Sequence, residues 1–442
     1  MKILSIVVGG FKNLKKTKID FNDITVLLSP NNYGKSNLME AIDFGVDFIH
    51  ESRKNRKTMM NWTKGIPICP ELQNEEYFFE IEFEDEELEN IEYKYIKYGF
   101  SFIWHRDDNT GERITNEWIE TRPNTSVRYT AFLRRDENKY RKSKTTSSFR
   151  KVELDNLQLA IDAIVLIEDA EISCVCKAIN ELSFRVCTSL DLGDRYQPSP
   201  IEYADDEGDV LRFDDEDIPK ALHILKTKDP NNYELFVEAV LSLFPEFSAL
   251  SLNEYSINSS NLEDSVSVIT SNNSEIIDVK DLPFRIKEHI YRLFVKSEYL
   301  NQPVSISNMS TGTKRVIWLL ANAFISNHIG ASIIGIEELE TSIHPRLIKQ
   351  LLEVLTDAVE HTPIIISSHS PYLAQYLKAE KIYIGIPNDK GIAKFQRFQS
   401  SKIKSLINSA RDNGLSVGEY IFELLSGDSD SYSILNSYLE ES

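Results

Sequence analysis

The stretch that decides the fold reads LSPNNYGKSN over residues 28–37. An apolar strand pattern, Ile24–Leu28, leads into it, and a helical pattern of apolar residues follows over about 37–47. A loop of this kind offers backbone N–H groups to phosphate oxygens, while its lysine reaches the β- and γ-phosphates and the next hydroxyl ligates Mg²⁺. Ser29 stands where the usual phosphate-loop pattern has its first glycine. A turn that only caps a helix would explain the later glycine, but not the lysine beside it.

Two later apolar strands also end in residues suited to phosphate chemistry. Residues 331–336 lead into Glu337 and Glu338, and residues 363–367 lead towards His369. The helical pattern between them makes a βαβ unit, so both strands should be parallel and open at one sheet edge, where ligands bind. We expect Glu337 to position Mg²⁺ through water, Glu338 to polarise the attacking water and His369 to contact the γ-phosphate. Taken alone, each of these residues could have no catalytic role. The two glutamates could simply extend into solvent at the end of a strand, and the histidine could be structural.

A further segment, residues 308–315, precedes an apolar helical pattern. Ser310 and Gly312 at this helix start are suited to binding an anion, and helix capping explains them equally well. Upstream, residues 77–118 alternate apolar and polar side chains with many aromatics, which predicts an antiparallel β layer beside the phosphate loop. Residues 153–190 look helical.

Composition excludes several classes of protein. The chain has 442 residues, and 49 Lys+Arg against 69 Asp+Glu give a net charge of −20, so any DNA contact must be a local patch. The longest apolar runs are too short for a membrane span, and the amino terminus lacks a secretion signal, so we expect a cytoplasmic protein. Four cysteines are too few for a disulfide framework. A basic segment, residues 122–151, and an acidic segment, residues 202–217, read as solvated loops or as partner contacts.

Four segments follow one another along the chain: the phosphate loop, the helix start with Ser310 and Gly312, the strand that ends in Glu337 and Glu338, and the strand that leads to His369. This is the order found in the ATPase head of the ABC superfamily. The sequence resembles SMC/RecF-like ATPases, most closely the overcoming-lysogenization-defect (OLD) type, an AAA-like ATPase of bacterial anti-phage defence. The resemblance implies an α/β fold, with a parallel P-loop sheet and helices, an antiparallel β layer and a helical insertion. Glu337 replaces the family's usual aspartate and Leu339 its usual proline.

The resemblance also implies the site residues and cofactors, which are ATP and Mg²⁺. Glu338 and His369 would be catalytic, and Ser36 and Glu337 would hold Mg²⁺. Ser310 and Gly312 would contact the nucleotide in trans, from a second subunit. The residues of the phosphate loop that would bind ATP are Asn31, Asn32, Tyr33, Gly34, Lys35, Ser36 and Asn37.

Four parts are expected along the chain. They are an N-terminal ATPase lobe over 1–151, a helical insertion with an acidic loop over 152–246, a C-terminal ATPase lobe over 247–400 and a tail over 401–442. The stretch after His369 is too short for the nuclease domain of OLD nucleases, so we predict no nuclease in this chain.

The expected function is that of a sensor or scaffold ATPase in anti-phage defence, resembling PARIS or Septu ATPase subunits. It would form a homodimer or higher even oligomer, act with a separate effector such as a nuclease and respond to a phage protein. The alternatives are a RecF-like DNA-repair ATPase, which the net charge disfavours, and an ATP-locked assembly protein with negligible turnover. We expect the partner to bind within residues 122–217, where the basic candidates are Arg134, Arg135, Arg141 and Lys142.

Overall fold

The computed structural model describes residues 1–440 except for 87, 89–92, 109, 137–138, 143–153, 165–169, 189–193, 198, 204–216, 258–283 and 360–361. The chain forms two compact units and passes between them several times. Unit 1 contains Met1–Thr188, Ala331–Glu340 and Glu360–Ser442, and unit 2 contains Ser189–Gly330 and Thr341–Val359.

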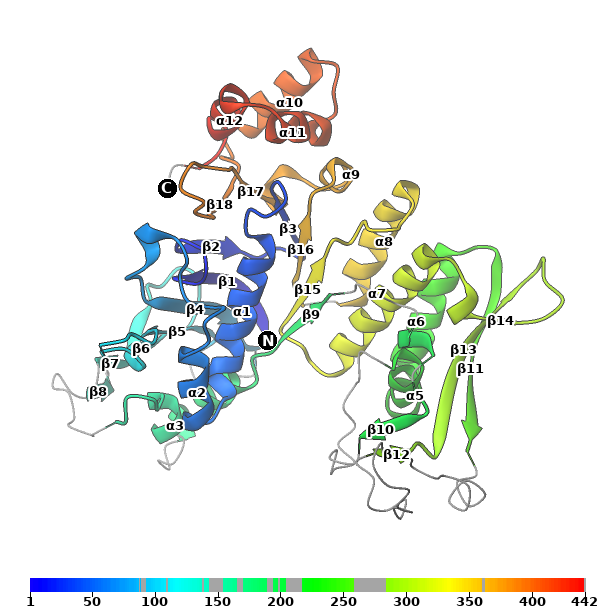
Figure 1. Ribbon diagram of the computed structural model, residues 1–442, viewed down its shortest axis with the longest axis horizontal. Coiled ribbons are helices and arrows are strands. Elements are labelled where there is room, and N and C mark those ends of the chain that lie inside the picture. Colours follow the sequence, from blue (N-terminus) through cyan, green and yellow to red (C-terminus); the bar gives the residue numbers. More distant parts are fainter. Residues whose placement is uncertain are drawn as a thin grey trace, which may run out of the picture. The chain divides into compact units, whose positions relative to one another are not determined.

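A six-stranded, mainly parallel sheet forms the centre of unit 1 (Figure 1). Its order is β18-β17-β3-β16-β15-β9, in which only β18 runs antiparallel to its neighbour. The central strands are almost entirely buried and consist largely of isoleucine, valine and leucine, as expected for a sheet covered on both faces. The strands are β3 (Ile24–Leu28), β9 (Phe184–Cys187), β15 (Ile333–Glu337), β16 (Ile364–Ser368), β17 (Ile382–Gly385) and β18 (Phe395–Arg397).

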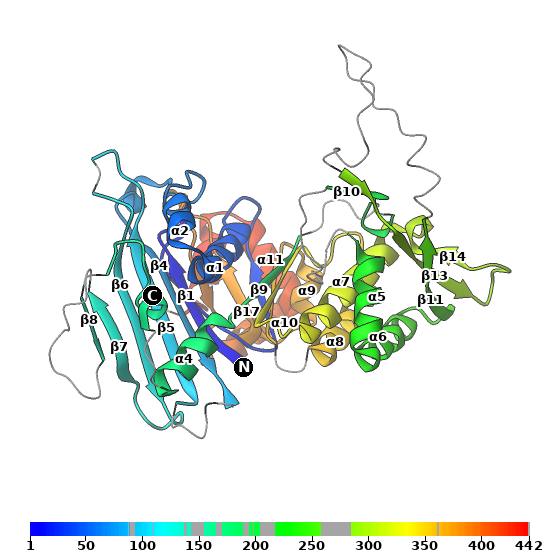
Figure 2. The ribbon, with the colours of Figure 1, turned by 90° about the horizontal axis from the view of Figure 1, so that it is seen from below.

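A seven-stranded antiparallel sheet forms the second layer of unit 1, in the order β2-β1-β4-β5-β6-β7-β8 (Figure 2). Strand β4 alternates strictly between buried and half-buried residues, which confirms the antiparallel layer expected from the same pattern in the sequence. The strands are β1 (Lys2–Gly9), β2 (Thr17–Asp20), β4 (Tyr77–Glu84), β5 (Tyr95–Ile103), β6 (Arg113–Arg122), β7 (Thr130–Asp136) and β8 (Lys139–Lys142).

Helix α1 (Lys35–His50) packs against both sheets. A Cβ atom on Gly45 would come within 2.2 Å of Phe79 in β4, and one on Gly335 in β15 would come within 2.7 Å of Met39. Both glycines therefore allow α1 to approach a sheet closely. The other helices of unit 1 are α2 (Arg53–Met60), α3 (Ala160–Ile164), α4 (Ala170–Asn180), α9 (Pro371–Gln375), α10 (Ile403–Asp412), α11 (Val417–Ser426) and α12 (Ser429–Asn436).

Unit 2 is built from helices and two small sheets. Helices α6 and α7 pack together through Phe236 and Phe324, and Asn232 donates a hydrogen bond to the Phe324 carbonyl. The helices are α5 (Ile218–Lys228), α6 (Pro230–Leu243), α7 (Thr311–His328) and α8 (Pro345–Ala358). The strands are β10 (Ile201–Tyr203), β11 (Phe247–Ser256), β12 (Phe284–Ile286), β13 (His289–Ser297) and β14 (Val304–Ser305).

The helical expectation for residues 153–190 is wrong over β9. Its strand, FRVC, pairs in parallel with β15 and completes one edge of the central sheet. The pattern misled because a four-residue strand is too short to show a period of its own, so it reads as a continuation of the preceding helix. Most of the acidic segment, residues 204–216, lies outside the described residues.

The basic segment contains a buried ion pair. Arg135 is only 3% exposed, and its guanidinium lies 3.9 Å from the carboxylate of Glu117, which also accepts hydrogen bonds from the N–H groups of Ala160 and Ile161. Arg135 is therefore an internal tie between β7 and the start of α3, and its expected role on a partner surface is wrong. Arg134 is exposed, whereas the side chains of Arg141 and Lys142 lie outside what the structure describes. In the described part of the chain, every helix is too short or too polar to cross a membrane.

Candidate nucleotide site

The phosphate loop connects β3 to α1 through two residues in the left-handed backbone region, Asn32 at φ +59° and Gly34 at φ +133°. Gly34 has no room for a side chain, because a Cβ atom there would lie 2.7 Å from that of Ala393. No side chain among the described residues caps the start of α1, and its first turn contains no acidic residue. The first N–H groups of such a helix need acceptors, and a phosphate supplies them.

Lys35 folds back over this loop. Its side chain is 9% exposed, and its Nζ donates hydrogen bonds to the carbonyl oxygens of Ser29 at 2.8 Å and Pro30 at 3.2 Å. Burial lowers the pKa of Lys35, while the charges of Glu338 and two nearby glutamates oppose that shift. The positive charge of Lys35 therefore interacts with the negative charges of the glutamates at the end of β15.

The side chain of Asn13, a residue that no sequence motif indicates, stabilises the phosphate loop through hydrogen bonds. Its amide accepts a hydrogen bond from Asn37 Nδ2 at 2.8 Å and donates to the carbonyls of Tyr33 at 2.9 Å and Gly391 at 3.0 Å. Tyr33 itself is buried, and its hydroxyl accepts from the Lys394 N–H and donates to the Lys394 carbonyl. These bonds fix the loop conformation, so Asn13 and Tyr33 position the loop.

The pairing of the parallel strands brings three predicted segments to one edge, as expected from the βαβ unit. Glu337 pairs with Ser367, and Ser368 pairs with Leu28, so the phosphate loop, the two glutamates and His369 all follow adjacent strand ends. The chain turns sharply at Glu338, whose φ of +48° is unusual for a residue with a side chain. Glu338 Oε1 lies 4.0 Å from His369 Nδ1, and their side chains are 53% and 47% exposed.

A third glutamate at this edge was also missed. Glu340 is 10% exposed, and its Oε1 accepts hydrogen bonds from the Ser368 hydroxyl at 2.7 Å and the His369 N–H at 3.3 Å. Its charge also acts on Lys35. The sequence shows it only as one more acid in a loop, and no motif or spacing sets it apart.

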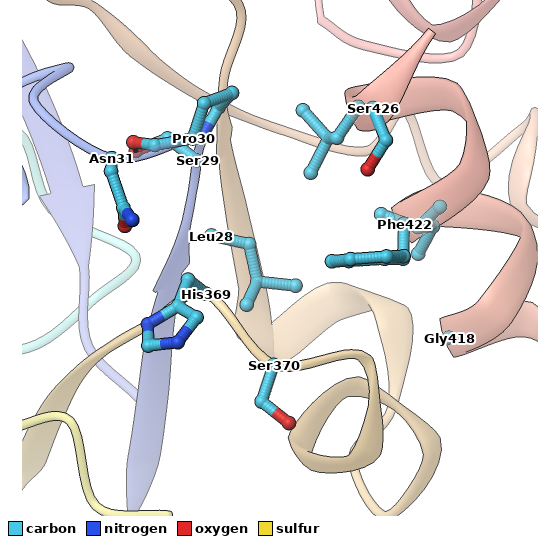
Figure 3. A pocket seen from close by; sticks show the side chains of 11 residues that line it. Leu28, Ser29, Pro30, Asn31, His369, Ser370, Gly418, Phe422 and Ser426 are labelled. Carbon is cyan, nitrogen blue, oxygen red and sulfur yellow. Dashed lines mark hydrogen bonds between the residues drawn. The ribbon is translucent and has the colours of Figure 1, made fainter. Parts of the chain in front are cut away.

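A pocket of about 270 Å³ opens beside the loop. Figure 3 shows Asn31 and His369 near each other on one side, with Phe422 and Ser426 of α11 across from them. The lining is mostly apolar towards α11 and polar towards Asn31 and His369. Helix α11 thus forms one wall of the space next to the phosphate loop.

Ser310 and Gly312, which are predicted to contact the nucleotide in trans, lie in unit 2. Ser310 caps α7, because its Oγ accepts a hydrogen bond from the Thr313 N–H at 3.2 Å. A Cβ atom on Gly312 would lie 2.4 Å from the Ser342 carbonyl oxygen, so glycine allows the helix start to touch the loop before α8. Ser310 and Gly312 therefore belong to unit 2, whereas the other predicted site residues belong to unit 1.

The donor set suits a magnesium nucleotide. The open helix start and Lys35 match phosphate oxygens, and the exposed Ser36 hydroxyl lies on the first turn of α1. Within the described residues, no three His, Cys, Asp or Glu side chains converge on a metal position. Proteins usually hold Mg²⁺ through one or two side chains together with phosphates and water, and the Ser36 hydroxyl is a side chain of that kind.

The open helix start, the buried loop lysine and the paired strand-end acid and histidine are the features expected of a P-loop nucleotide site. The chain belongs to the AAA ATPase domain family, whose model matches residues 1–374. No curated protein matches the chain.

Solved SMC heads have a similar fold. A SmcHead bound to the C-winged helix domain of ScpA is 14% identical, with a TM-score of 0.50, and the match covers 91% of this chain and 99% of that one. The SMC head domain from Thermotoga maritima is 11% identical, with a TM-score of 0.44 and coverage of 90% and 100%. A Pyrococcus furiosus head with an extended coiled coil, bound to the C-terminal domain of ScpA, is 14% identical, with a TM-score of 0.47 and coverage of 93% and 99%.

Proposed function

We propose that this chain binds and hydrolyses ATP with Mg²⁺ at the edge formed by the phosphate loop, Glu338 and His369. The observation that carries the proposal is the 4.0 Å approach of Glu338 Oε1 to His369 Nδ1 on the strand next to that loop. An acid and a histidine that meet beside a phosphate site can orient and deprotonate a water.

Each residue of the edge has a role in this proposal. Lys35 and the first N–H groups of α1 hold the phosphates, and Ser36 and Glu337 hold Mg²⁺, Glu337 through water. When bound, Mg²⁺ neutralises charge on the phosphates and orients them. Glu338 accepts the proton of the attacking water, and its left-handed backbone turn directs the side chain off the end of the strand. His369 holds the same water.

The variant Glu338→Gln tests the catalytic assignment. The amide keeps the shape of the side chain but cannot accept the proton, so hydrolysis should fall by about a hundredfold or more while ATP binding persists. Single-turnover hydrolysis and nucleotide titration measure the two effects. Glu353→Gln, on the exposed face of α8, is a matched control and should leave hydrolysis unchanged. A Glu338→Gln protein that hydrolyses ATP at the wild-type rate would show that another group is the base.

The same proposal includes a dimer or higher even oligomer. In it, Ser310 and Gly312 of one copy face the γ-phosphate bound by the other copy. The support is the family and the position of both residues at a helix start whose backbone N–H groups suit an anion. Gel filtration of Glu338→Gln with and without ATP tests it, because a variant that retains ATP should accumulate the closed dimer.

The biological role that we propose is that of a sensor or scaffold ATPase of anti-phage defence, of the OLD type and resembling PARIS or Septu subunits. It would act with a separate effector, such as a nuclease, in the cytoplasm. The support is the sequence resemblance, together with the net charge of −20, which suits a protein partner better than DNA. Copurification with the product of a neighbouring gene is the test.

Two alternatives make different predictions. A RecF-like repair ATPase should bind duplex DNA with an affinity that falls steeply with salt, which a salt titration measures directly. An ATP-locked assembly protein should bind ATP and dimerise as wild type but show no turnover in a single-turnover assay.

A further inference from the structure

Glu340 is the buried member of the three glutamates at the nucleotide edge. Its side chain is 10% exposed, against 53% for Glu338. Burying a carboxylate is costly unless hydrogen bonds or opposite charges compensate it. A residue of this kind three positions after a strand end therefore needs a reason to be there.

Its contacts converge on the turn that carries His369. Glu340 Oε1 accepts from the Ser368 hydroxyl at 2.7 Å, and the same hydroxyl accepts from the Ser370 N–H at 3.0 Å. The His369 N–H adds a third bond to the turn, again to Glu340 Oε1, at 3.3 Å. The carboxylate thus fixes the backbone on both sides of His369.

Its charge also faces the ring of that histidine. Glu340 Oε1 lies 3.9 Å from His369 Nδ1, the same ring nitrogen that lies 4.0 Å from Glu338 Oε1. The second carboxylate oxygen, Oε2, is buried and has no hydrogen-bond partner among the described atoms. Two carboxylates on one side of an imidazole favour a proton on Nδ1, which leaves Nε2 available to the reactants.

We infer that Glu340 is a positioning residue for ATP hydrolysis, which acts by holding the His369 turn and setting the protonated nitrogen of its ring. The inference rests on the proposed function. It concerns mainly the hydrolysis step, because the hydrogen bonds of Glu340 run to Ser368 and His369, whereas only its charge acts on Lys35 of the phosphate loop.

The variant Glu340→Gln tests the role of the negative charge, because it removes that charge and keeps the size and shape of the side chain. The amide oxygen can still accept from Ser368 and His369, but the negative charge beside Nδ1 is gone. We expect the kcat for ATP hydrolysis to fall about tenfold or more, with ATP affinity within about threefold of wild type. Glu340→Asp keeps the charge and should recover part of the lost rate. Glu353→Gln again serves as the exposed control.

A double-mutant cycle with His369→Ala tests whether Glu340 acts through the histidine. In that background Glu340→Gln should have no further effect on the rate. Wild-type kcat in Glu340→Gln would overturn the inference, as would a tenfold loss that persists in full without His369. If Glu340→Gln does not fold, Ser368→Ala replaces it in the same cycle. This variant removes one bond to the turn, and its loss of rate should likewise vanish in the His369→Ala background.

The two proposals fail in different ways. A wild-type protein that does not hydrolyse ATP overturns the proposed function, and the inference falls with it. A wild-type protein that hydrolyses ATP, alongside a Glu340→Gln variant of equal rate, overturns the inference alone.

Discussion

Helices α1 and α7 begin in contrasting ways, although the sequence assigns both starts to phosphate binding. At α1 the chain enters through Gly34, and no described side chain caps the helix. At α7 the Ser310 hydroxyl accepts from the Thr313 N–H, and Gly312 lies against the Ser342 carbonyl. One helix start is open to an anion, whereas the other has satisfied one of its own donors.

The difference teaches how to weigh a serine or glycine at a helix start. Helix capping by serine stabilises a helix by about 1 kcal/mol, so its presence alone indicates structure. An uncapped start has no such structural reward, and its first N–H groups have no side-chain acceptor, so a phosphate can supply one. Two of the predictions that follow test the contrast and a third tests the interior of α1, from the largest expected effect to the smallest.

Lys35→Ala should have the largest effect, because it removes the cation from the open helix start. ATP binding should be lost, with affinity reduced by about a hundredfold or more, since no other residue of the loop supplies a positive charge to the β- and γ-phosphates. Titration with a fluorescent ATP analogue measures it. The fold should persist, because the hydrogen bonds of Nζ to loop carbonyls are local. Tight binding by the variant would remove the loop from the nucleotide site.

Ser310 distinguishes a cap from a ligand contact at α7. Ser310→Ala should destabilise the fold by about 1 kcal/mol through loss of the cap, whereas Ser310→Asp should keep the cap. If Ser310 faces a γ-phosphate in trans, the aspartate should repel it and reduce hydrolysis by about tenfold or more, without weakening ATP binding to the same subunit. Thermal unfolding and steady-state hydrolysis measure the two effects. An aspartate variant with wild-type turnover would leave Ser310 as a cap only.

Heterodimers extend the same test. Mixed with Lys35→Ala, a Ser310→Asp protein should recover part of its hydrolysis, because one composite site then has both an intact Lys35 loop and an intact Ser310. Mixed dimers as inactive as either parent would contradict the shared site.

Asp43, in the interior of α1, should have the smallest effect. Burial and the charges of Asp47 and Glu40 raise the pKa of Asp43 to about 7, well above its value of 3.8 in an unfolded chain. The folded protein therefore binds this proton more tightly, so stability falls as pH rises from about 4 to about 7 and stays reduced above that range. Asp43→Asn should raise the free energy of unfolding by roughly 1–2 kcal/mol at pH 8.

Thermal unfolding at two pH values checks this prediction. The gain of Asp43→Asn should shrink as the pH falls below about 3.8, where the wild-type carboxyl is largely protonated in both states. Asp389→Asn, at an exposed position, should show no pH-dependent gain. An Asp43→Asn gain that is equal at both pH values would mean that the effect is not electrostatic.

The sequence allowed the central edge to be predicted because its parts follow strict local rules. Apolar strands that end in polar residues, joined by a helix, must be parallel, and this places Glu338 and His369 at the same edge as the phosphate loop. Their 4.0 Å approach follows from that pairing. Their chemical roles remain predictions.

Other residues could not be predicted, because their roles depend on distant contacts. Asn13 meets the phosphate loop and the Gly391 turn only in the folded chain. Arg135 lies among many basic residues, and only its contact with Glu117 separates it from them. Strand β9 could not be predicted, because four residues are too few to show the alternation of a strand and because its partner β15 lies far along the chain.

The position of β3 within its sheet has a consequence for biosynthesis. Its two neighbours, β16 and β17, begin only at Ile364 and Ile382, although the phosphate loop follows β3 near the start of the chain. A ribosome adding about 5–20 residues per second would release the loop many seconds before either neighbour emerges. The nascent chain therefore keeps β3 without its two sheet neighbours until β16 and β17 have emerged, and the nucleotide edge can assemble only after that point.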